Sequence, residues 1–363
     1  MEVVMSTLGG YSGFHNSLSD YRAARGSATD LSSDLYRPAA LIDQAEEEVG
    51  KILNDAPHVI LTGTSESACA LALSVVPVGG EMIVGYGVPR DIVTHTRERT
   101  GVQITWIEPS LRGVTRGFSD SVRTIFLPDV QLLLDVHDLR LEWKEIVEYL
   151  ERKRFRGNLV VYNSMAPIWM ALAAASFRTI AIVPMYRFWF QDDAFGGALA
   201  SVHDLSDLRR TQLVTGCHFL APTSTLSLQK RSIHQQCYAR AIHALELAKA
   251  LQTNGQARGF SVGGTFQSPG SMVVTLWSSS LDYGKLEDAL DRLGHRRAAA
   301  VSDLVGHRFT AIRPLERVDF PNSVSPIPVG LRIAIGNPQA YKDDNLKQCI
   351  VDAVQEMTTR SWI

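Results

Sequence analysis

A turn of three small residues is the first part of the sequence that could do chemistry. Gly63-Thr64-Ser65 follows an apolar run, residues 58–62, and precedes a helical pattern that begins at Ala68. Because the free N–H groups and the dipole at a helix N-terminus both attract negative charge, this turn could hold a phosphate or a carboxylate. The simpler interpretation is a turn whose threonine or serine only caps the helix.

A second candidate for anion binding lies near the other end of the chain. Arg332 stands inside an apolar strand-like stretch, residues 329–336. A guanidinium group stays charged, so a buried arginine needs a carboxylate or phosphate partner. The alternative is an arginine on an exposed strand face that points to solvent.

Aromatic side chains follow three further apolar runs. Tyr86 follows residues 82–84, Tyr162 and Asn163 end the next such stretch, and residues 186–190 read Tyr-Arg-Phe-Trp-Phe. Open α/β sheets bind ligands at the carboxyl ends of their strands, where such rings could stack on a flat ligand. The alternative interpretations are an ordinary loop tyrosine and an aromatic packing surface.

The composition argues against several classes of function. The net charge of −2 over 363 residues predicts no nucleic-acid partner, which would need a basic face. No run approaches the roughly 18 apolar residues of a membrane span, and no secretory signal pattern is visible, so we expect a cytoplasmic protein. The histidines and the four cysteines lack metal-ligand spacing, and there is no G-x-S-x-G nucleophile elbow, so no metal is expected.

The elements that must position these residues alternate between strand and helix. Short continuous apolar runs predict strands at residues 58–62, 82–84, 102–107, 124–127, 158–162 and 179–183. Helical spacing predicts helices at residues 68–76, 89–100, 143–150 and 168–175. Strands without an in-out alternation are typical of a mostly parallel sheet that is covered by helices on both faces.

The pattern changes after residue 222. A long helix is predicted at residues 232–251, strands at 271–277 and 331–335, and helices at 283–293 and 344–357. We therefore predict an N-terminal arm and first helix (1–55), a large sheet domain (56–221), a linker helix (222–252) and a small α/β domain (253–363).

Taken in order, these stretches resemble the cystathionine γ-synthase/γ-lyase family of Cys/Met-metabolism enzymes, over residues 36 to 357. Gly63-Thr64-Ser65 is similar to the family's S-G-M loop, which binds the phosphate of the cofactor pyridoxal phosphate (PLP). Tyr86-Gly87 is similar to its Y-G-G, whose tyrosine stacks on the PLP ring. Arg332 matches the arginine that holds the substrate α-carboxylate.

The resemblance implies further properties. Tyr36-Arg37 is similar to a Y-S-R element that reaches the cofactor phosphate of a neighbouring subunit, so a homodimer or homotetramer is expected. The implied fold is α/β and PLP-transferase-like, that is, aspartate aminotransferase fold type I. It has a large domain with a mostly parallel sheet covered by helices and a smaller C-terminal α/β domain.

Two departures from the family concern the cofactor. The family's V-D-N-T reads Val161-Tyr162-Asn163-Ser164 here, so Tyr162 replaces the aspartate that pairs with the pyridine nitrogen. The family's lysine position falls at Tyr186 or Arg187, and no lysine occurs between Lys153 and Lys230. An arginine stays protonated and cannot form the Schiff base, and without the aspartate the ring is a weak electron sink. We therefore expect no covalently bound PLP.

Three functions follow from this combination. The first is a PLP-independent enzyme, a lyase or transferase, that holds a small amino-acid-like ligand at Arg332. Its catalytic candidates are Tyr162, Tyr186 and Arg187. The second is a non-catalytic pseudoenzyme or scaffold, in a complex with another protein and with Phe188-Trp189-Phe190 filling the old pocket. The third is a PLP-dependent C–S lyase or transsulfuration enzyme whose amine comes from Lys230.

Overall fold

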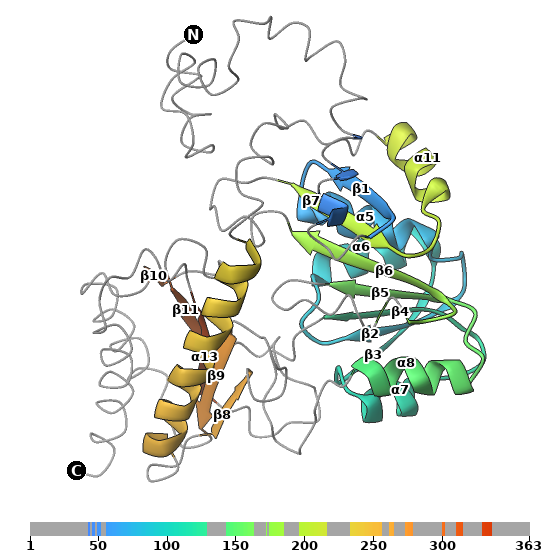
Figure 1. The fold of residues 1–363 in the computed structure, drawn as a ribbon. Coiled ribbons are helices and arrows are strands. Elements are labelled where there is room, and N and C mark those ends of the chain that lie inside the picture. Colours follow the sequence, from blue (N-terminus) through green and yellow to red (C-terminus); the bar gives the residue numbers. More distant parts are fainter. Residues whose placement is uncertain are drawn as a thin grey trace, which may run out of the picture.

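Two β-sheets, which occupy separate regions of the molecule, organise the chain (Figure 1). The computed structural model describes residues 43, 46–47, 49–51, 56–128, 143–162, 172, 174–184, 196–215, 233–255, 261–264, 273–278, 300–301, 310–314 and 329–335. The larger sheet is formed before residue 202 and the smaller sheet after residue 260.

The larger sheet has seven strands and is mostly parallel. They are β1 (His58–Thr62), β2 (Glu81–Gly85), β3 (Gln103–Ile107), β4 (Val122–Pro128), β5 (Asn158–Tyr162), β6 (Arg178–Pro184) and β7 (Gly197–Ser201), in the order β1-β7-β6-β5-β4-β2-β3. Within this sheet β7 runs antiparallel to β1 and β6, and the other pairs are parallel. The C-terminal ends of β1, β2, β4, β5 and β6 therefore share one side of the sheet, the carboxyl edge.

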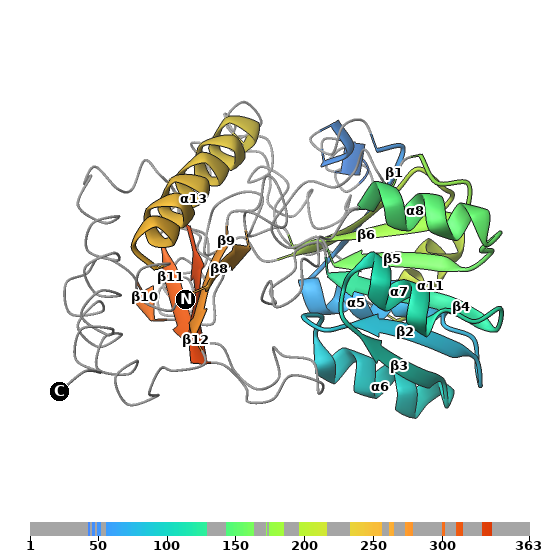
Figure 2. The same cartoon turned by 90° about the horizontal axis from the view of Figure 1, so that it is seen from below.

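Helices cover both faces of this sheet, as the continuous apolar runs predict. One face carries α5 (Ser65–Ala72), which continues as the 3₁₀ helix η1 (Leu73–Val75), together with α6 (Arg90–Thr100) and α11 (Ser206–Thr215). The other face carries α7 (Leu111–Gly117) and α8 (Trp143–Arg152). Figure 2 shows α8 and α6 on opposite sides of the strands.

Alternate residues of the strands enter two separate apolar cores. In β5, Leu159 and Val161 pack with α8, whereas Val160 and Tyr162 pack on the face of α5. Leu159, Val160 and Val161 are fully buried. Burial of one such aliphatic side chain contributes about 1.5–3 kcal/mol, so the strands are stabilised from both faces.

The free side of β1 is covered by side chains. The backbone N–H of Leu61 donates to Oε1 of Glu46 at 2.9 Å, and the Leu61 carbonyl accepts from Nε2 of Gln212 at 2.5 Å. The Val59 carbonyl accepts from Nη2 of Arg209 at 3.0 Å, and Arg209 also pairs with Glu46. These contacts satisfy backbone groups of an edge strand that could otherwise pair with another chain.

The smaller sheet has five strands. They are β8 (Ser261–Gly264), β9 (Val273–Ser278), β10 (Ala300–Val301), β11 (Ala311–Pro314) and β12 (Val329–Ala334), in the order β10-β11-β12-β9-β8. The pair β10–β11 is parallel and the other pairs are antiparallel. The long helix α13 (Ile233–Gly255) lies against β8 and β9, as Figure 2 shows.

The structure confirms the predicted α/β class and corrects some element bounds. The strands at 58–62 and 158–162 match β1 and β5 residue for residue. The helix predicted at 68–76 begins earlier, at Ser65, and ends in a 3₁₀ turn. Predicted helices 283–293 and 344–357 lie outside the described residues, and the four domain bounds stay predictions.

The sequence did not predict β7, α7 or α11, nor the short strands β8, β10 and β11 of the smaller sheet. Strand β7 reads Gly-Ala-Leu-Ala-Ser and lacks the β-branched residues that mark a strand, and α7 contains Gly113 and Gly117, which weaken a helix.

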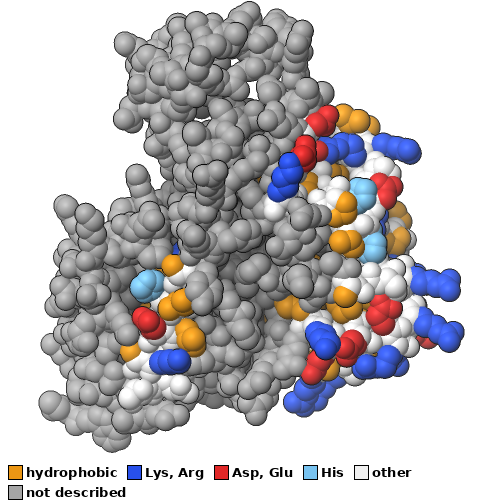
Figure 3. Space-filling view, in the orientation of Figure 1, with side chains coloured by type: hydrophobic (Ala, Val, Ile, Leu, Met, Phe, Trp, Pro, Cys, Tyr) orange, Lys and Arg blue, Asp and Glu red, His pale blue; other side chains and the backbone are white. Residues whose placement is uncertain are grey.

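The surface of the larger-sheet region is polar and mixed in charge. Figure 3 shows basic and acidic side chains interspersed over the described part of the face in view. Among the helices described, none combines the length and the apolar character that a membrane span requires.

Candidate functional site

The turn between β1 and α5 lies at the carboxyl edge and is tightly held. The Thr64 side chain caps α5 by accepting a hydrogen bond from the backbone N–H of Ser67 at 3.0 Å. The Thr62 hydroxyl lies 2.8 Å from the Thr64 carbonyl oxygen and 3.2 Å from that of Gly197. The capping interpretation is therefore confirmed for Thr64.

Gly197 allows this turn to approach β7. It pairs with Thr62 of β1 and with Pro184 of β6. A Cβ atom at Gly197 would lie 2.5 Å from the Thr64 carbonyl oxygen and 2.8 Å from the Cβ of Ala68. Any larger residue would push the turn away from the sheet.

Ser65 differs from Thr64 although the two are adjacent. It is the first residue of α5 and is 2% exposed. Among the described residues its Oγ has no hydrogen-bond partner. A buried hydroxyl without a partner is costly, so this atom is available to donate to an anion at the N-terminus of α5.

Tyr86 follows β2 beside the point where the strand order reverses. The chain passes from β2 outward to β3 and then returns to β4, and open sheets bind ligands at such a point. The Tyr86 ring is 6% exposed and stacks on Trp106 of β3, with centroids 5.7 Å apart and an interplanar angle of 29°. The Arg90 guanidinium lies 5.5 Å from the Trp106 centroid.

Tyr162 ends β5 at the same edge, where it is opposite Pro128 of β4 and Ile182 of β6. It is 8% exposed and belongs to the apolar cluster that includes Phe126, Val160 and Ile182. This position combines a phenol with an apolar environment, and it offers no carboxylate.

The described lysines do not supply an amine at the carboxyl edge. Lys51 pairs with Glu47, Lys144 lies 4.0 Å from Glu148 with its side chain 87% exposed, and Lys249 is exposed on α13. Lys153 follows α8 near the start of β5, at the opposite edge, and its Nζ lies 5.9 Å from the ring centroid of Tyr149.

None of the described residues at the carboxyl edge is a lysine that could form a Schiff base with PLP. The connection between β6 and β7, residues 185–195, contains no lysine.

Arg332 lies on β12 of the smaller sheet and is 5% exposed. The expectation of a buried arginine is therefore confirmed, and an exposed strand-face arginine is ruled out. A second buried arginine, Arg240 of α13, is 1% exposed, and its Nε donates to the carbonyl of Ile335 at 2.7 Å. This contact ties α13 to the end of the strand that carries Arg332.

Several predicted site residues lie outside the described residues. They are Tyr36, Arg37, Asn163, Tyr186 and Arg187, together with Lys230 and the stretch Phe188-Trp189-Phe190. Their roles stay predictions.

The structure also adds residues that the sequence patterns did not indicate. Trp106 stacks on Tyr86, Arg90 lies over the ring of Trp106, and Gly197 allows the β1–α5 turn to approach β7. The sequence around Trp106 gives no sign that this ring contacts Tyr86. The contact arises only because β2 and β3, which are separate in the sequence, pair in the sheet. Among the described residues no group of histidine, cysteine, aspartate and glutamate could hold a metal ion.

No protein-family model matches this sequence, and no curated protein is similar enough to match it. Solved structures do match. A methionine γ-lyase from Micromonospora echinospora is 15% identical, with a TM-score of 0.66 over 88% of this chain and 86% of that chain. A cystathionine γ-lyase from Lactobacillus plantarum in complex with L-serine is 11% identical, with a TM-score of 0.67 over 88% and 87%.

A putative O-acetylhomoserine (thiol)-lyase from Campylobacter jejuni is 14% identical, with a TM-score of 0.68 over 94% of this chain and 92% of that chain. That protein carries a pyridoxyl-lysine phosphate. The expected resemblance is thus confirmed at the level of fold. The chain has the α/β architecture of the PLP-dependent fold type I enzymes and is similar in structure to their cystathionine γ-synthase/γ-lyase-like members.

Proposed function

We propose that this chain is a divergent cystathionine γ-synthase/γ-lyase-like protein that acts on an amino-acid-like ligand without covalently held PLP. The observation that carries the proposal is Arg332, a buried cation on an otherwise apolar strand. A guanidinium group binds a carboxylate through two parallel hydrogen bonds, which both orients the ligand and selects for its charge. The ligand class is therefore a small molecule with a free α-carboxylate.

The carboxyl edge supplies the second part of the proposed site. The Ser65 hydroxyl and the N-terminus of α5 can donate to a further anionic group of the ligand. The Tyr86 ring, held against Trp106, presents a phenol that can donate to an oxyanion formed during a reaction. Such a donor stabilises charge without an amine, so a lyase or transferase reaction without the cofactor is chemically consistent with these residues.

The first experiment asks whether the purified full chain holds PLP covalently. We expect protein incubated with PLP to show no aldimine absorbance that sodium borohydride discharges, and mass spectrometry to find no pyridoxyl adduct after reduction. An adduct on any lysine would refute the proposal and would favour the PLP-dependent alternative.

The second experiment tests Arg332 directly. L-serine and L-methionine would be titrated by calorimetry against ethanolamine and 3-(methylthio)propylamine, which lack the carboxylate. We expect the amino acids alone to bind, and Arg332→Gln to weaken them by about 10- to 100-fold, the cost of losing a charged hydrogen bond. Arg332→Lys should retain part of the affinity. Arg97→Gln, which removes an exposed arginine of α6, is the matched control.

The second candidate function is a non-catalytic relative that binds another protein. The packing of Tyr162 favours it, because an 8% exposed ring within an apolar cluster stabilises the sheet without any ligand. If no amino acid binds and the chain co-purifies with one partner in a fixed ratio, this candidate replaces the first. Reproducible turnover by the isolated chain would refute it.

A further inference from the structure

The segment that follows helix α8 concentrates positive charge on the surface. Residues 152–156 read Arg-Lys-Arg-Phe-Arg and connect the C-terminal end of α8 with the start of β5 (Figure 1). Phe155 is 7% exposed and packs against Phe177 with ring centroids 5.3 Å apart, so it holds the segment against the larger sheet. The other four side chains are exposed, and we call them the basic turn: Arg152, Lys153, Arg154 and Arg156.

The described acidic side chains do not neutralise the basic turn. Glu151, which precedes it, accepts hydrogen bonds from the backbone N–H of Ser176 at 2.5 Å and from the Ser176 hydroxyl at 2.6 Å. The arginines of the turn form no ion pair with any described residue. Arg123 of β4 adds another exposed cation, and its carbonyl oxygen would lie 2.2 Å from a Cβ atom at Gly157, at the end of the turn.

Helix electrostatics explain only part of this charge. The C-terminal end of a helix dipole attracts cations, which accounts for Arg152 and Lys153 at the end of α8. The attraction falls off within the last helical turn, and Arg154 and Arg156 lie beyond it. These two arginines therefore need another explanation.

Arg154 has a backbone conformation that favours glycine. Its φ is +53°, and among the described residues it is the one non-glycine residue with a positive φ. Its N–H donates to the Glu151 carbonyl at 2.9 Å and the N–H of Phe155 donates to the Leu150 carbonyl at 3.0 Å, a pattern that usually has glycine at this position. The exposed Arg154 side chain gains no packing that would offset the strain, so the outlier indicates a use for the side chain itself.

Charge complementarity indicates the kind of partner. Guanidinium groups bind carboxylates through paired hydrogen bonds, and four cations within five residues match a short run of aspartate and glutamate. A nucleic acid would need a longer basic surface on a basic protein, whereas the net charge of this chain is −2. A membrane surface would also need apolar side chains to insert, and the exposed large apolar residues that the structure describes lie elsewhere: Val78, Leu213, Val214 and Ile242.

We propose that the basic turn, together with Arg123, binds a short acidic segment of another protein. This surface lies at the edge of the larger sheet where β4 and β5 begin, opposite the carboxyl edge. The inference is therefore independent of the proposed function and of Arg332.

The experiment measures the fluorescence anisotropy of a labelled peptide of ten glutamates with the full chain at pH 7.5. We expect binding that weakens as the salt concentration rises. Arg152→Gln combined with Arg156→Gln should weaken it by about 3- to 10-fold. The matched control, Arg97→Gln combined with Arg210→Gln, removes the same charge from exposed positions on α6 and α11 and should change binding by less than about twofold.

A single change separates binding from folding. Arg154→Gly should weaken binding of the peptide by about 2- to 5-fold, yet raise the melting temperature by about 1–3 °C, because glycine adopts a positive φ without strain. Arg154→Lys keeps the charge, so it should retain most of the binding with no rise in melting temperature. A variant that folds more stably but binds less cannot owe its weaker binding to misfolding.

Several results would overturn the inference. One is equal peptide binding by the basic-turn variant and its control, and another is full binding by Arg154→Gly. Tighter binding of a ten-nucleotide RNA, or of phosphatidylserine vesicles, through the same arginines would assign the surface to a nucleic acid or a membrane instead. Sedimentation of the chain alone tests a second copy as the occupant: an oligomer that the basic-turn changes dissociate would make this surface a subunit interface.

Discussion

The two ends of the carboxyl edge differ in character. At the β1–α5 turn, polar groups dominate: Thr64 caps the helix and the Ser65 hydroxyl is buried without a partner among the described residues. At the end of β5, Tyr162 packs among Phe126, Val160 and Ile182. One end of this edge thus carries a buried polar group, whereas the other end is part of the apolar core.

This difference has a physical basis. A helix N-terminus attracts anions through backbone groups that any sequence supplies, so it survives many substitutions. Recognition of a cationic ring depends on one carboxylate and one amine, and a single exchange of either removes it. The following predictions test whether the two ends are as different as the contacts indicate, from the largest expected effect to the smallest.

Tyr162→Asp should be the most damaging change. A carboxylate in this apolar cluster would lose the packing of the ring and bury a charge, so we expect a loss of at least about 3–5 kcal/mol in the free energy of unfolding. Tyr162→Phe keeps the ring and should cost less than about 1.5 kcal/mol. Urea denaturation measures both. A stable Tyr162→Asp variant would show that the end of β5 is still a polar site.

Gly197→Ala should destabilise the protein by about 1–3 kcal/mol, because the added Cβ meets the Thr64 carbonyl oxygen at 2.5 Å. The turn must then move, so phosphate binding should weaken in the same variant. Thermal melting with and without phosphate gives both values. Unchanged melting would mean that the turn is not held against β7.

Thr64→Ala and Ser65→Ala form a matched pair on adjacent hydroxyls. Thr64→Ala removes the cap of α5 and should cost about 1 kcal/mol of stability. Ser65→Ala removes a hydroxyl without a described partner, so stability should stay within about 0.5 kcal/mol or rise while phosphate binding falls. If Thr64→Ala instead weakened phosphate binding and Ser65→Ala instead lowered stability, the assignment of Thr64 to capping and of Ser65 to ligand binding would be wrong.

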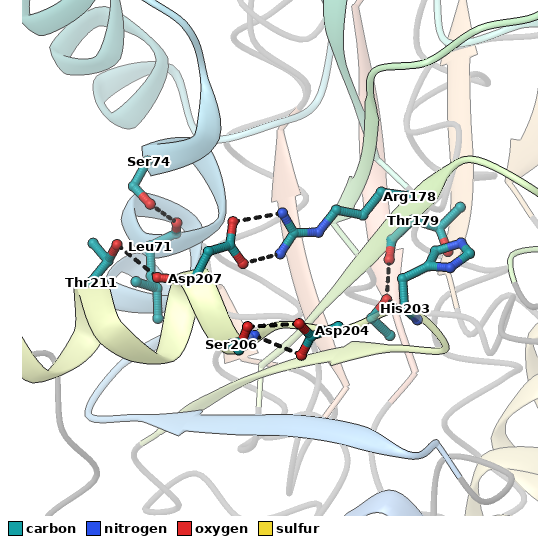
Figure 4. Close-up of polar contacts among 10 residues, drawn as sticks. Leu71, Ser74, Arg178, Thr179, His203, Asp204, Ser206, Asp207 and Thr211 are labelled. Carbon is teal, nitrogen blue, oxygen red and sulfur yellow. Dashed lines mark hydrogen bonds and ion pairs between the residues drawn. The ribbon is translucent and has the colours of Figure 1, made fainter.

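The opposite edge of the sheet serves as a structural reference. There Arg178 of β6 makes two hydrogen bonds to the Asp207 carboxylate of α11, as Figure 4 shows. The hydrogen bond from Arg178 lowers the pKa of Asp207, so its stabilisation is present at neutral pH and is lost as the pH falls below about 4.

Because this pair is partly exposed, Asp207→Asn should cost less than about 1 kcal/mol at pH 7, and it should cost less at pH 2.5, where more of the carboxyl group is protonated. Urea denaturation at the two pH values measures this, with the exposed Asp120→Asn as control. No effect on phosphate binding is expected, and a change there would mean that the two edges are coupled.

Local patterns were sufficient for much of this fold. Continuous apolar runs determined the strands β1 and β5 and the coverage of the sheet on both faces, since a strand buried on both sides needs apolar residues at every position. The motif order also indicated the fold type, and the apolar strand around Arg332 indicated a buried arginine. Short elements rich in glycine and alanine, such as β7, were not predicted, because their contacts with neighbouring strands stabilise them and their own residues carry no strand pattern.

What only the tertiary structure decided depends on pairing between distant segments. Strand register placed Arg313 and Thr275 beside Arg332, and the pairing of β2 with β3 placed Trp106 on Tyr86. Among the described residues, the fold also leaves the Ser65 hydroxyl without a partner, whereas the neighbouring Thr64 hydroxyl caps α5. Residue type and spacing along the chain determine which groups can bind a ligand, but contacts across strands determine which of them remain available, because packing satisfies some polar groups and leaves others unsatisfied.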